Sequence, residues 1–336
     1  MTWRVAGAAR ATTGKRANQE DAFAIWPPGA QAATGRGEGL LAVVADGMGG
    51  HAGGEVAGQL ACDTFVATFP AAEGAAGQRL EGALEASNNA IAARAAETEQ
   101  LRGMGCTLVG AWIDREGLRW VSVGDSLLLL FRAPDVLRLN ADHSLGAFLD
   151  SQVRQNLIAA SEAESNPYRN ALRSALTGKA LEILDVRADP YPLAAGDWVI
   201  LASDGIATLE GDEIGDIVYA GRDASPERMA ESLIAAVLAK DEPEQDNTTV
   251  LVLKIAGEAT AQASSDEVAT RIVRHDIAPA AAHVPQRQEP DGVETTQRIA
   301  PPPAYRAVLS RYRNAILGIG MALMFLIGWM VRAMLD

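Results

Sequence analysis

Carboxylates at the ends of strand-like segments are the chemically most informative residues of this 336-residue chain. The stretch Leu40–Ala45 is apolar throughout and is followed directly by Asp46 and a glycine-rich run. Such a run is typical of a buried strand, and the glycines let peptide carbonyls approach whatever Asp46 binds. An isolated Asp-Gly pair is more often a hairpin turn, so the interpretation depends on whether other carboxylates share this placement.

Three further aspartates share it. Asp125, Asp204 and Asp246 each abut an apolar segment typical of a core strand; these segments are 118–123, 127–131, 198–202 and 249–255. Four carboxylates gathered at one sheet edge repel each other strongly unless cations neutralise them. The alternative is chance placement without a site.

The available donor atoms favour magnesium or manganese. The chain has only two cysteines and four histidines, and it lacks both Cys-x-x-Cys and HExxH, which argues against a tetrahedral zinc site. Oxygen ligands suit Mg²⁺ or Mn²⁺ in octahedral geometry. Two such ions that share a bridging carboxylate can activate a water and stabilise an in-line displacement at phosphorus. This chemistry predicts hydrolysis of a phosphate ester.

The segment 15–23, KRANQEDAF, holds candidate residues for the substrate side. Arg16 can bind two phosphate oxygens at once through its guanidinium group, although it could equally be an ordinary solvated arginine. If this segment is a strand, the adjacent Glu20 and Asp21 point to opposite sides of it. Only one of them then faces the ions directly, and the other acts through water or backbone.

Seven collinear motifs between about Trp3 and Ile255 resemble the metal-dependent type 2C serine/threonine protein phosphatases, and their bacterial branch in particular. They are R-x-x-x-E-D (16–21), DGMGGHAGGE (46–55), GCT (105–107), VGDS (123–126), DHSL (142–145), GDWVILASDGI (196–206) and DNTT (246–249). The resemblance implies an α+β fold, with a central antiparallel β-sandwich flanked on both sides by helix pairs, over residues 1–257.

The resemblance also implies a metal-binding role for most of these carboxylates. Asp46 bridges two Mn²⁺ or Mg²⁺ ions, and the Gly47 carbonyl completes one coordination shell. Asp204 and Asp246 bind the other ion, as implied by the same resemblance. The remaining implied ligands are Glu20 and Asp21, which hold the second ion directly or through water, and Asp125, which binds a third, weakly held ion.

Catalysis in the family implies a water nucleophile activated at the binuclear centre, without a phosphoenzyme. Arg16 holds the substrate phosphate, and Arg16, Asp46 and Asp204 form the implied catalytic set.

Four positions bear on how closely the chain follows the family. Met48 stands where animal and plant relatives have a histidine that protonates the leaving group, and His51 is not its obvious substitute, so a water is the alternative acid. Cys106 replaces a threonine in a strand-like segment, where we expect it to pack in the core. His143 is expected to satisfy the backbone and not to touch substrate.

Helical patterns complete the domain. Apolar spacing predicts helices over 54–69 and 80–99, and Ser225-Pro226-Glu227 is typical of a helix start, with the helix running to about Lys240. Between Asp142 and Leu181 the pattern is one of short helical pieces. This region is either a flap beside the active site that selects protein substrates or a peripheral helical segment.

The C-terminal part of the sequence predicts a membrane anchor. Residues 258–314 are rich in Ala and Pro and read as a flexible linker, and residues 315–331 carry no charge and are followed by a short tail, 332–336. As a helix, 315–331 spans roughly 26 Å, the short end for a bilayer crossing. A buried core helix and an amphipathic surface helix are the alternatives. Three arginines precede the segment and one follows it, which places the catalytic domain on the cytoplasmic side of the inner membrane.

Composition limits the remaining possibilities. The net charge of −14 argues against general nucleic-acid binding, and two cysteines without a disulfide pattern agree with a reducing cytoplasm. No signal peptide is recognisable in the first ten residues. Together with the resemblance to type 2C phosphatases, the sequence implies a Mn²⁺- or Mg²⁺-dependent hydrolase of protein phosphoserine and phosphothreonine, and the resemblance alone implies an opposing serine/threonine kinase. A slow or inactive phosphoprotein-binding regulator, and a phosphatase dedicated to one regulatory protein, are the alternatives.

Overall fold

The computed structural model describes residues 4–28, 31–33, 39–49 and 52–257. The predicted linker and the predicted membrane span over 315–331 lie outside these residues. Within the described part of the chain, no helix combines the length and apolar character needed to cross a membrane.

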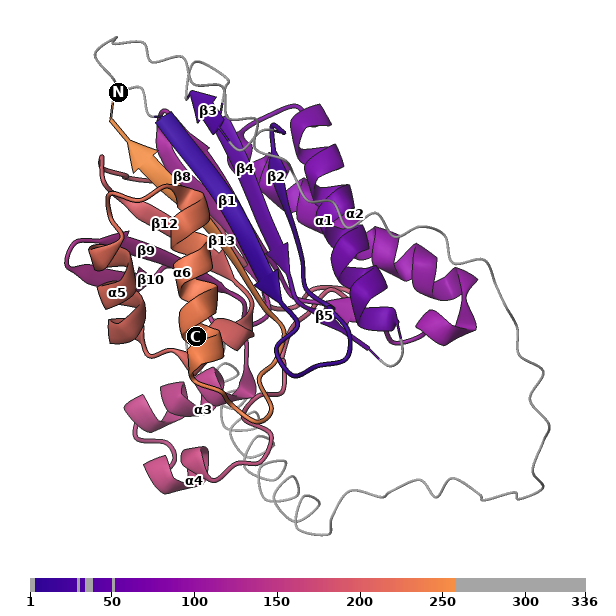
Figure 1. Ribbon diagram of the computed structural model, residues 1–336. Helices are drawn as coiled ribbons and strands as arrows, with labels where there is room; N and C mark the ends of the chain where they lie inside the picture. The colour runs from indigo at the N-terminus through magenta and orange to yellow at the C-terminus, as the bar shows by residue number, and fades with distance from the viewer. Residues whose placement is uncertain (1–3, 29–30, 34–38, 50–51, 258–336) are drawn as a thin grey trace, which may run out of the picture. The chain divides into compact units, whose positions relative to one another are not determined.

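Two antiparallel sheets form the centre of the domain (Figure 1). The six-stranded sheet has the order β10 (Asp135–Arg138), β9 (Leu127–Arg132), β12 (Trp198–Ala202), β13 (Thr248–Ala256), β1 (Arg4–Thr12) and β3 (Gln31–Ala33). The five-stranded sheet has the order β11 (Asp185–Tyr191), β8 (Gly117–Val123), β7 (Leu108–Asp114), β4 (Gly39–Ala45) and β2 (Ala22–Trp26). A short ribbon pairs β5 (Gly47–Met48) with β6 (Gly105–Cys106).

A helix pair covers the outer face of each sheet. Helices α1 (Gly53–Ala71) and α2 (Ala76–Glu97) pack on the five-stranded sheet, and α5 (Gly211–Ala220) and α6 (Pro226–Ala239) pack on the six-stranded sheet. The remaining helices are α3 (Leu145–Arg154), α4 (Ala160–Glu164) and the 3₁₀ turns η1 (Glu99–Leu101) and η2 (Asp204–Thr208). The expected α+β sandwich with flanking helices is confirmed.

Alternation along the central strands explains the layers. In β4, Leu40, Ala42 and Val44 point into the core between the two sheets, whereas Leu41, Val43 and Ala45 point toward α1 and α2. Successive strand side chains face opposite ways, so a strand covered on both faces must be apolar throughout. The same logic gives β12 its continuous apolar run, with a third core between the six-stranded sheet and α5 and α6.

The predicted helices are found with small shifts of their ends. The pattern over 54–69 corresponds to α1 and that over 80–99 to α2. Ser225 caps α6, its hydroxyl accepting a hydrogen bond from the Arg228 N–H at 3.5 Å, and Pro226 occupies the first turn. Between Asp142 and Leu181 the chain forms only the short helices α3 and α4, followed by an irregular segment.

Candidate metal centre

Strand ends from both sheets meet at one end of the sandwich, and each brings an acid. From the five-stranded sheet, Asp46 follows β4, and Glu20 and Asp21 precede β2, whose Ala22 pairs with Ala45. From the six-stranded sheet, Asp204 follows β12 and Asp246 precedes β13, and Ala202 pairs with Val250. Asp125 lies in the connection from β8 to β9, which passes from one sheet to the other. Antiparallel pairing thus places the start of one strand beside the end of its neighbour.

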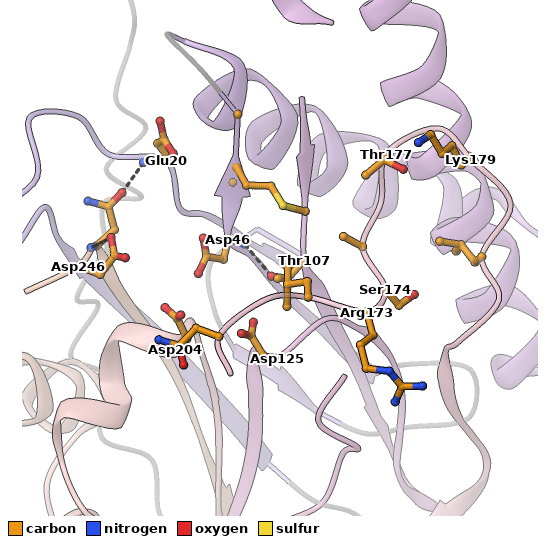
Figure 2. A pocket seen from close by; sticks show the side chains of 18 of the residues that line it. Glu20, Asp46, Thr107, Asp125, Arg173, Ser174, Thr177, Lys179, Asp204 and Asp246 are labelled. Atoms are coloured by element: carbon orange, nitrogen blue, oxygen red, sulfur yellow. Dashed lines mark hydrogen bonds between the residues drawn. The ribbon is translucent and has the colours of Figure 1, made fainter. Parts of the chain in front are cut away.

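These acids line one side of an open pocket of about 780 Å³ (Figure 2). The acidic side consists of Glu20, Asp46, Asp125, Asp204 and Asp246, with Arg16 among them. The irregular segment 170–182 forms the opposite side and contributes Arg173, Ser174, Thr177 and Lys179. Every predicted site residue except Asp21 therefore lines the same pocket, and Asp21 lies directly behind it.

Several carboxyl groups of this pocket lie in an environment that disfavours their charge. Burial, together with the charges of Asp21 and Asp204, raises the pKa of Asp46 well above its ordinary value. Burial and the neighbouring Asp246 raise the pKa of Asp204. Burial and the charge of Asp204 raise the pKa of Asp125 to about 6. Such a cluster is stable in its charged form only when cations accompany it.

Asp21 is the most deeply placed member of the cluster. Asp21 is only 9 % exposed, and its Oδ2 accepts a hydrogen bond from the Ser203 hydroxyl at 2.7 Å. Its other oxygen, Oδ1, is buried and has no hydrogen-bond partner among the described residues. Burial raises the pKa of Asp21 to about 7, an effect that the hydrogen bond from Ser203 only partly opposes.

Glu20 and Asp21 lie in the loop before β2, which begins only at Ala22, so the strand on which their expected divergence was based does not include them. Glu20 lines the pocket, and burial raises the pKa of its carboxyl group while the charge of Arg16 opposes the rise. The Asn247 side chain holds the loop between β1 and β2 in place. Its Oδ1 accepts a hydrogen bond from the Glu20 N–H at 2.7 Å, and its Nδ2 donates to the carbonyl groups of Thr13 and Asn18.

A buried hydroxyl pair holds the backbone of Asp46. The Asp46 N–H donates to Thr107 Oγ1 at 3.0 Å, and the Thr107 N–H donates to the Asp46 carbonyl at 2.8 Å. Thr107 Oγ1 also lies 2.6 Å from Ser126 Oγ, next to Asp125. Reasoning from sequence did not assign roles to Asn247, Thr107 or Ser126, although all three lie within the seven motifs.

The Gly47 backbone is packed too closely for any side chain. A Cβ at this position would overlap the carbonyl oxygens of Gly54 and Glu20, so glycine is required sterically. The close approach brings the start of α1, the loop before β2 and the Asp46 turn together, which fixes the position of the Gly47 peptide.

Arg16 forms an ion pair with Asp246, with 2.6 Å between Nη2 and Oδ2. Its side chain is 59 % exposed and lines the pocket, where a guanidinium group is within reach of a bound anion. In this arrangement it neutralises one of the acids that are predicted to bind metal.

The other described residues that the sequence singled out either line the pocket or are buried. Met48 lines the pocket, and no histidine is among the pocket-lining residues that the structure describes. The ring of His143 is buried and its Nδ1 accepts a hydrogen bond from the Gly124 N–H at 3.1 Å, which confirms the structural role. Burial lowers the pKa of His143 and keeps the ring neutral. Cys106 is fully buried in the core, as expected.

The donor set fits hard divalent cations. The acidic side chains of this side offer carboxylate oxygens as possible metal ligands. Asp21 adds a buried oxygen, Oδ1, that has no hydrogen-bond partner among the described residues. Nowhere in the described ranges do three or more Asp, Glu, His or Cys side chains converge closely enough to hold one ion by themselves. Mg²⁺ and related ions usually combine one or two carboxylates with several waters, so waters would have to complete the coordination here.

Residues 8–246 match the sequence model of the family described as protein phosphatase 2C. The chain belongs to the protein phosphatase 2C family. The match includes every residue of the acidic side of the pocket, from Arg16 to Asp246.

Several relatives within the protein phosphatase 2C family carry names that state an activity. The serine/threonine protein phosphatase PstP of Mycobacterium tuberculosis is 34 % identical over 217 residues, which cover 64 % of this chain and 40 % of PstP. The protein phosphatase PhpP of Streptococcus pneumoniae is 30 % identical over 190 residues, covering 53 % of this chain and 72 % of PhpP. The chain thus spans less than half the length of PstP.

Solved structures show the same fold. The crystal structure of M. tuberculosis PstP has a TM-score of 0.61 at 32 % identity and covers 76 % of this chain and all of that chain. The catalytic domain of PstP in complex with two manganese ions has a TM-score of 0.59 at 30 % identity, with the same coverage.

Proposed function

We propose that this protein hydrolyses phosphoserine and phosphothreonine in proteins and needs Mn²⁺ or Mg²⁺ to do so. The observation that carries the proposal is the acidic side of the pocket, where partly buried carboxyl groups from both sheets lie beside Arg16 and have raised pKa values. Membership of the protein phosphatase 2C family and the names of PstP and PhpP support it. The expected partners are phosphorylated proteins and a serine/threonine kinase of opposite activity.

Two ions would be held by the acids predicted from the sequence. These ligands are Asp46 and the Gly47 carbonyl, Asp204, Asp246, Glu20 and Asp21, with Asp125 available to a third ion. When bound, the ions neutralise the cluster, make water more acidic and stabilise the charge that develops at phosphorus. The manganese complex of PstP supports this assignment.

The other residues of the pocket position the reactants. Thr107 fixes the Asp46 backbone. Arg16 pairs with Asp246 and would be free to bind phosphate oxygens if a cation took its place there. The Met48 thioether cannot donate a proton, and a water is the acid that we propose for the departing serine or threonine oxygen.

Turnover by the full chain in a mild non-ionic detergent tests the proposal. With MnCl₂ we expect hydrolysis of 4-nitrophenyl phosphate and of a phosphothreonine peptide, and none with EDTA. Asp204→Ala should lower kcat/KM by about 100-fold or more, because metal-ion catalysis contributes several kcal/mol. Asp223→Ala, a change at an exposed aspartate outside the pocket, is the matched control.

Two results would contradict this function. If the wild type binds phosphoproteins but does not hydrolyse them, the protein is a phosphoprotein-binding regulator and not an enzyme. If Asp204→Ala keeps full activity, the acidic cluster is not the catalytic centre.

We also propose that residues 315–331 anchor the protein in the inner membrane, with the catalytic domain in the cytoplasm. The support is the sequence alone: an uncharged apolar stretch with three arginines before it and one after it. After cell lysis without detergent, we expect the full chain in the membrane pellet and a chain truncated after residue 257 in the supernatant. Recovery of the full chain in the supernatant would contradict the anchor.

A further inference from the structure

The pocket side opposite the acids is built around a turn, Thr177–Lys179, that is fixed to the domain at several points. On one side, Leu176 exchanges backbone hydrogen bonds with Cys106 of β6, at 3.0 and 2.8 Å. On the other side, the turn contacts α2 through a buried side chain, Asn88. This part of the 170–182 segment is therefore a rigid wall of the pocket.

Asn88 makes three hydrogen bonds to the turn. Its Oδ1 accepts from the Thr177 N–H at 3.2 Å and the Gly178 N–H at 2.9 Å, and its Nδ2 donates to the Lys179 carbonyl at 2.7 Å. Both polar atoms of the amide group, Oδ1 and Nδ2, are thus used, and the residue is only 6 % exposed.

Gly178 lets the turn approach the helix. It has a φ of +77°, and a Cβ would lie 2.6 Å from both Cα and Cβ of Ala92 on α2. A side chain here would push the turn away from the helix and toward the pocket. The backbone geometry thus agrees with a turn that is held in one place.

The fixed turn presents Lys179 at the pocket. The Lys179 side chain is exposed, lines the pocket, and forms no ion pair with any residue of the described ranges. Arg173 lies at the other end of the same wall, with its guanidinium carbon 4.2 Å from the centre of the Phe148 ring. Of the residues of segment 170–182 that line the pocket, Glu182 alone is acidic, whereas Arg173 and Lys179, labelled in Figure 2, are basic.

We propose that Lys179, positioned by Asn88, makes the enzyme prefer phosphopeptides with an acidic residue next to the phosphorylated one. The inference rests on the proposed phosphatase function, because the peptide must enter this pocket with its phosphate toward the acidic, metal-binding side. Residues that flank the phosphate then face the opposite wall. A cation at a fixed place on that wall attracts acidic side chains and repels basic ones.

The test compares two phosphothreonine peptides that differ only in the flanking residues, glutamate in one and lysine in the other. For the full chain with MnCl₂ in detergent, we expect kcat/KM to be about fivefold higher for the acidic peptide at low salt, as for an exposed ion pair. The preference should shrink in 0.5 M NaCl because salt screens exposed charges. A purely structural role of Lys179 predicts no such salt dependence.

Lys179→Glu should abolish or reverse the preference. The matched control is Arg115→Glu, the same charge change in the exposed turn between β7 and β8, outside the pocket, which should keep the preference of the wild type. Asn88→Ala should raise KM for the acidic peptide and reduce the preference, whereas Asn89→Ala, at an exposed neighbour on α2, should not. Lys179→Gln leaves the Asn88 hydrogen bonds to the turn in place, should lose the preference, and serves as the second variant if Asn88→Ala is unstable.

The outcomes separate this inference from the proposed function. If the wild type hydrolyses both peptides with equal kcat/KM, or if Lys179→Glu retains the acidic preference, the inference is wrong although the phosphatase function stands. If the wild type hydrolyses neither peptide nor 4-nitrophenyl phosphate, the proposed function itself fails.

Discussion

Replacing Asp21 by asparagine should stabilise the metal-free protein, and the gain should grow with pH. Burial raises the pKa of Asp21 from the ordinary 3.8 to about 7, a difference of about 3 units. At about 1.4 kcal/mol per unit, ionising this carboxyl group in the folded state costs on the order of 4 kcal/mol. Because the folded pKa is the higher one, the favourable contribution of the neutral acid is complete below pH 3.8 and is lost as pH rises through about 7.

Asparagine has the shape of the neutral acid and cannot ionise. Its amide N–H groups replace either Oδ2, which accepts from Ser203, or Oδ1, which has no partner, so about 1–3 kcal/mol is lost whatever the pH. The net gain at pH 8 is therefore about 1–3 kcal/mol. The informative quantity is how the difference in unfolding free energy between variant and wild type changes with pH. Proton linkage predicts that this difference moves by about 2–3 kcal/mol in favour of the variant between pH 5 and pH 8.

Urea unfolding of the full chain in detergent and EDTA, followed by tryptophan fluorescence, measures this difference. The control is Asp223→Asn, an exposed site at which the difference should stay constant with pH. Adding Mn²⁺ should reverse the order, because the wild type gains stability from binding the ion and the variant gains less. A difference between Asp21→Asn and wild type that does not change from pH 5 to pH 8 would refute the argument that buried, mutually repelling carboxyl groups destabilise the metal-free domain.

Three further substitutions test how the site is held. Gly47→Ala should cost about 1–3 kcal/mol of unfolding free energy and weaken Mn²⁺ binding, since its Cβ would overlap two carbonyl oxygens; unaltered urea midpoints would contradict the steric argument. Thr107→Val removes the hydroxyl that accepts from the Asp46 N–H and should cost about 1–3 kcal/mol and lower Mn²⁺ affinity in calorimetric titration, whereas Thr107→Ser should retain most of both. His143→Ala leaves the buried Gly124 N–H without its acceptor and should lower the free energy of unfolding by about 1–3 kcal/mol. It should change the KM for 4-nitrophenyl phosphate less than Arg16→Ala does. A larger change in KM would mean that the ring touches substrate.

Much of the fold follows from local patterns. Strands β4 and β12 are recognisable because both of their faces are buried, which requires continuous apolar runs. The start of α6 is recognisable because Ser225 and Pro226 suit the two positions that open a helix. The sequence does not show which strands pair, since that depends on contacts between residues far apart in the chain, such as β1 with β13.

The candidate site likewise has features that the local sequence predicts and features that depend on contacts between distant residues. The sequence alone determined the chemistry, because aspartates next to strand ends and the scarcity of cysteine and histidine restrict the choice to oxygen ligands and hard cations. The order of the seven motifs along the chain also predicted the type 2C phosphatase family, and the family match over residues 8–246 confirms that prediction.

Tertiary structure decided what surrounds those acids. Asp21 is buried against Ser203, 182 positions away, and Lys179 faces the pocket because Asn88, 91 positions away, holds its turn. Neither relationship leaves a periodic or local signal in the chain, because a hydrogen bond between distant segments depends on how the layers pack. The sequence therefore specified which groups could do chemistry, and packing decided which of them lose their contact with water, which are held rigid, and which face one another across the pocket.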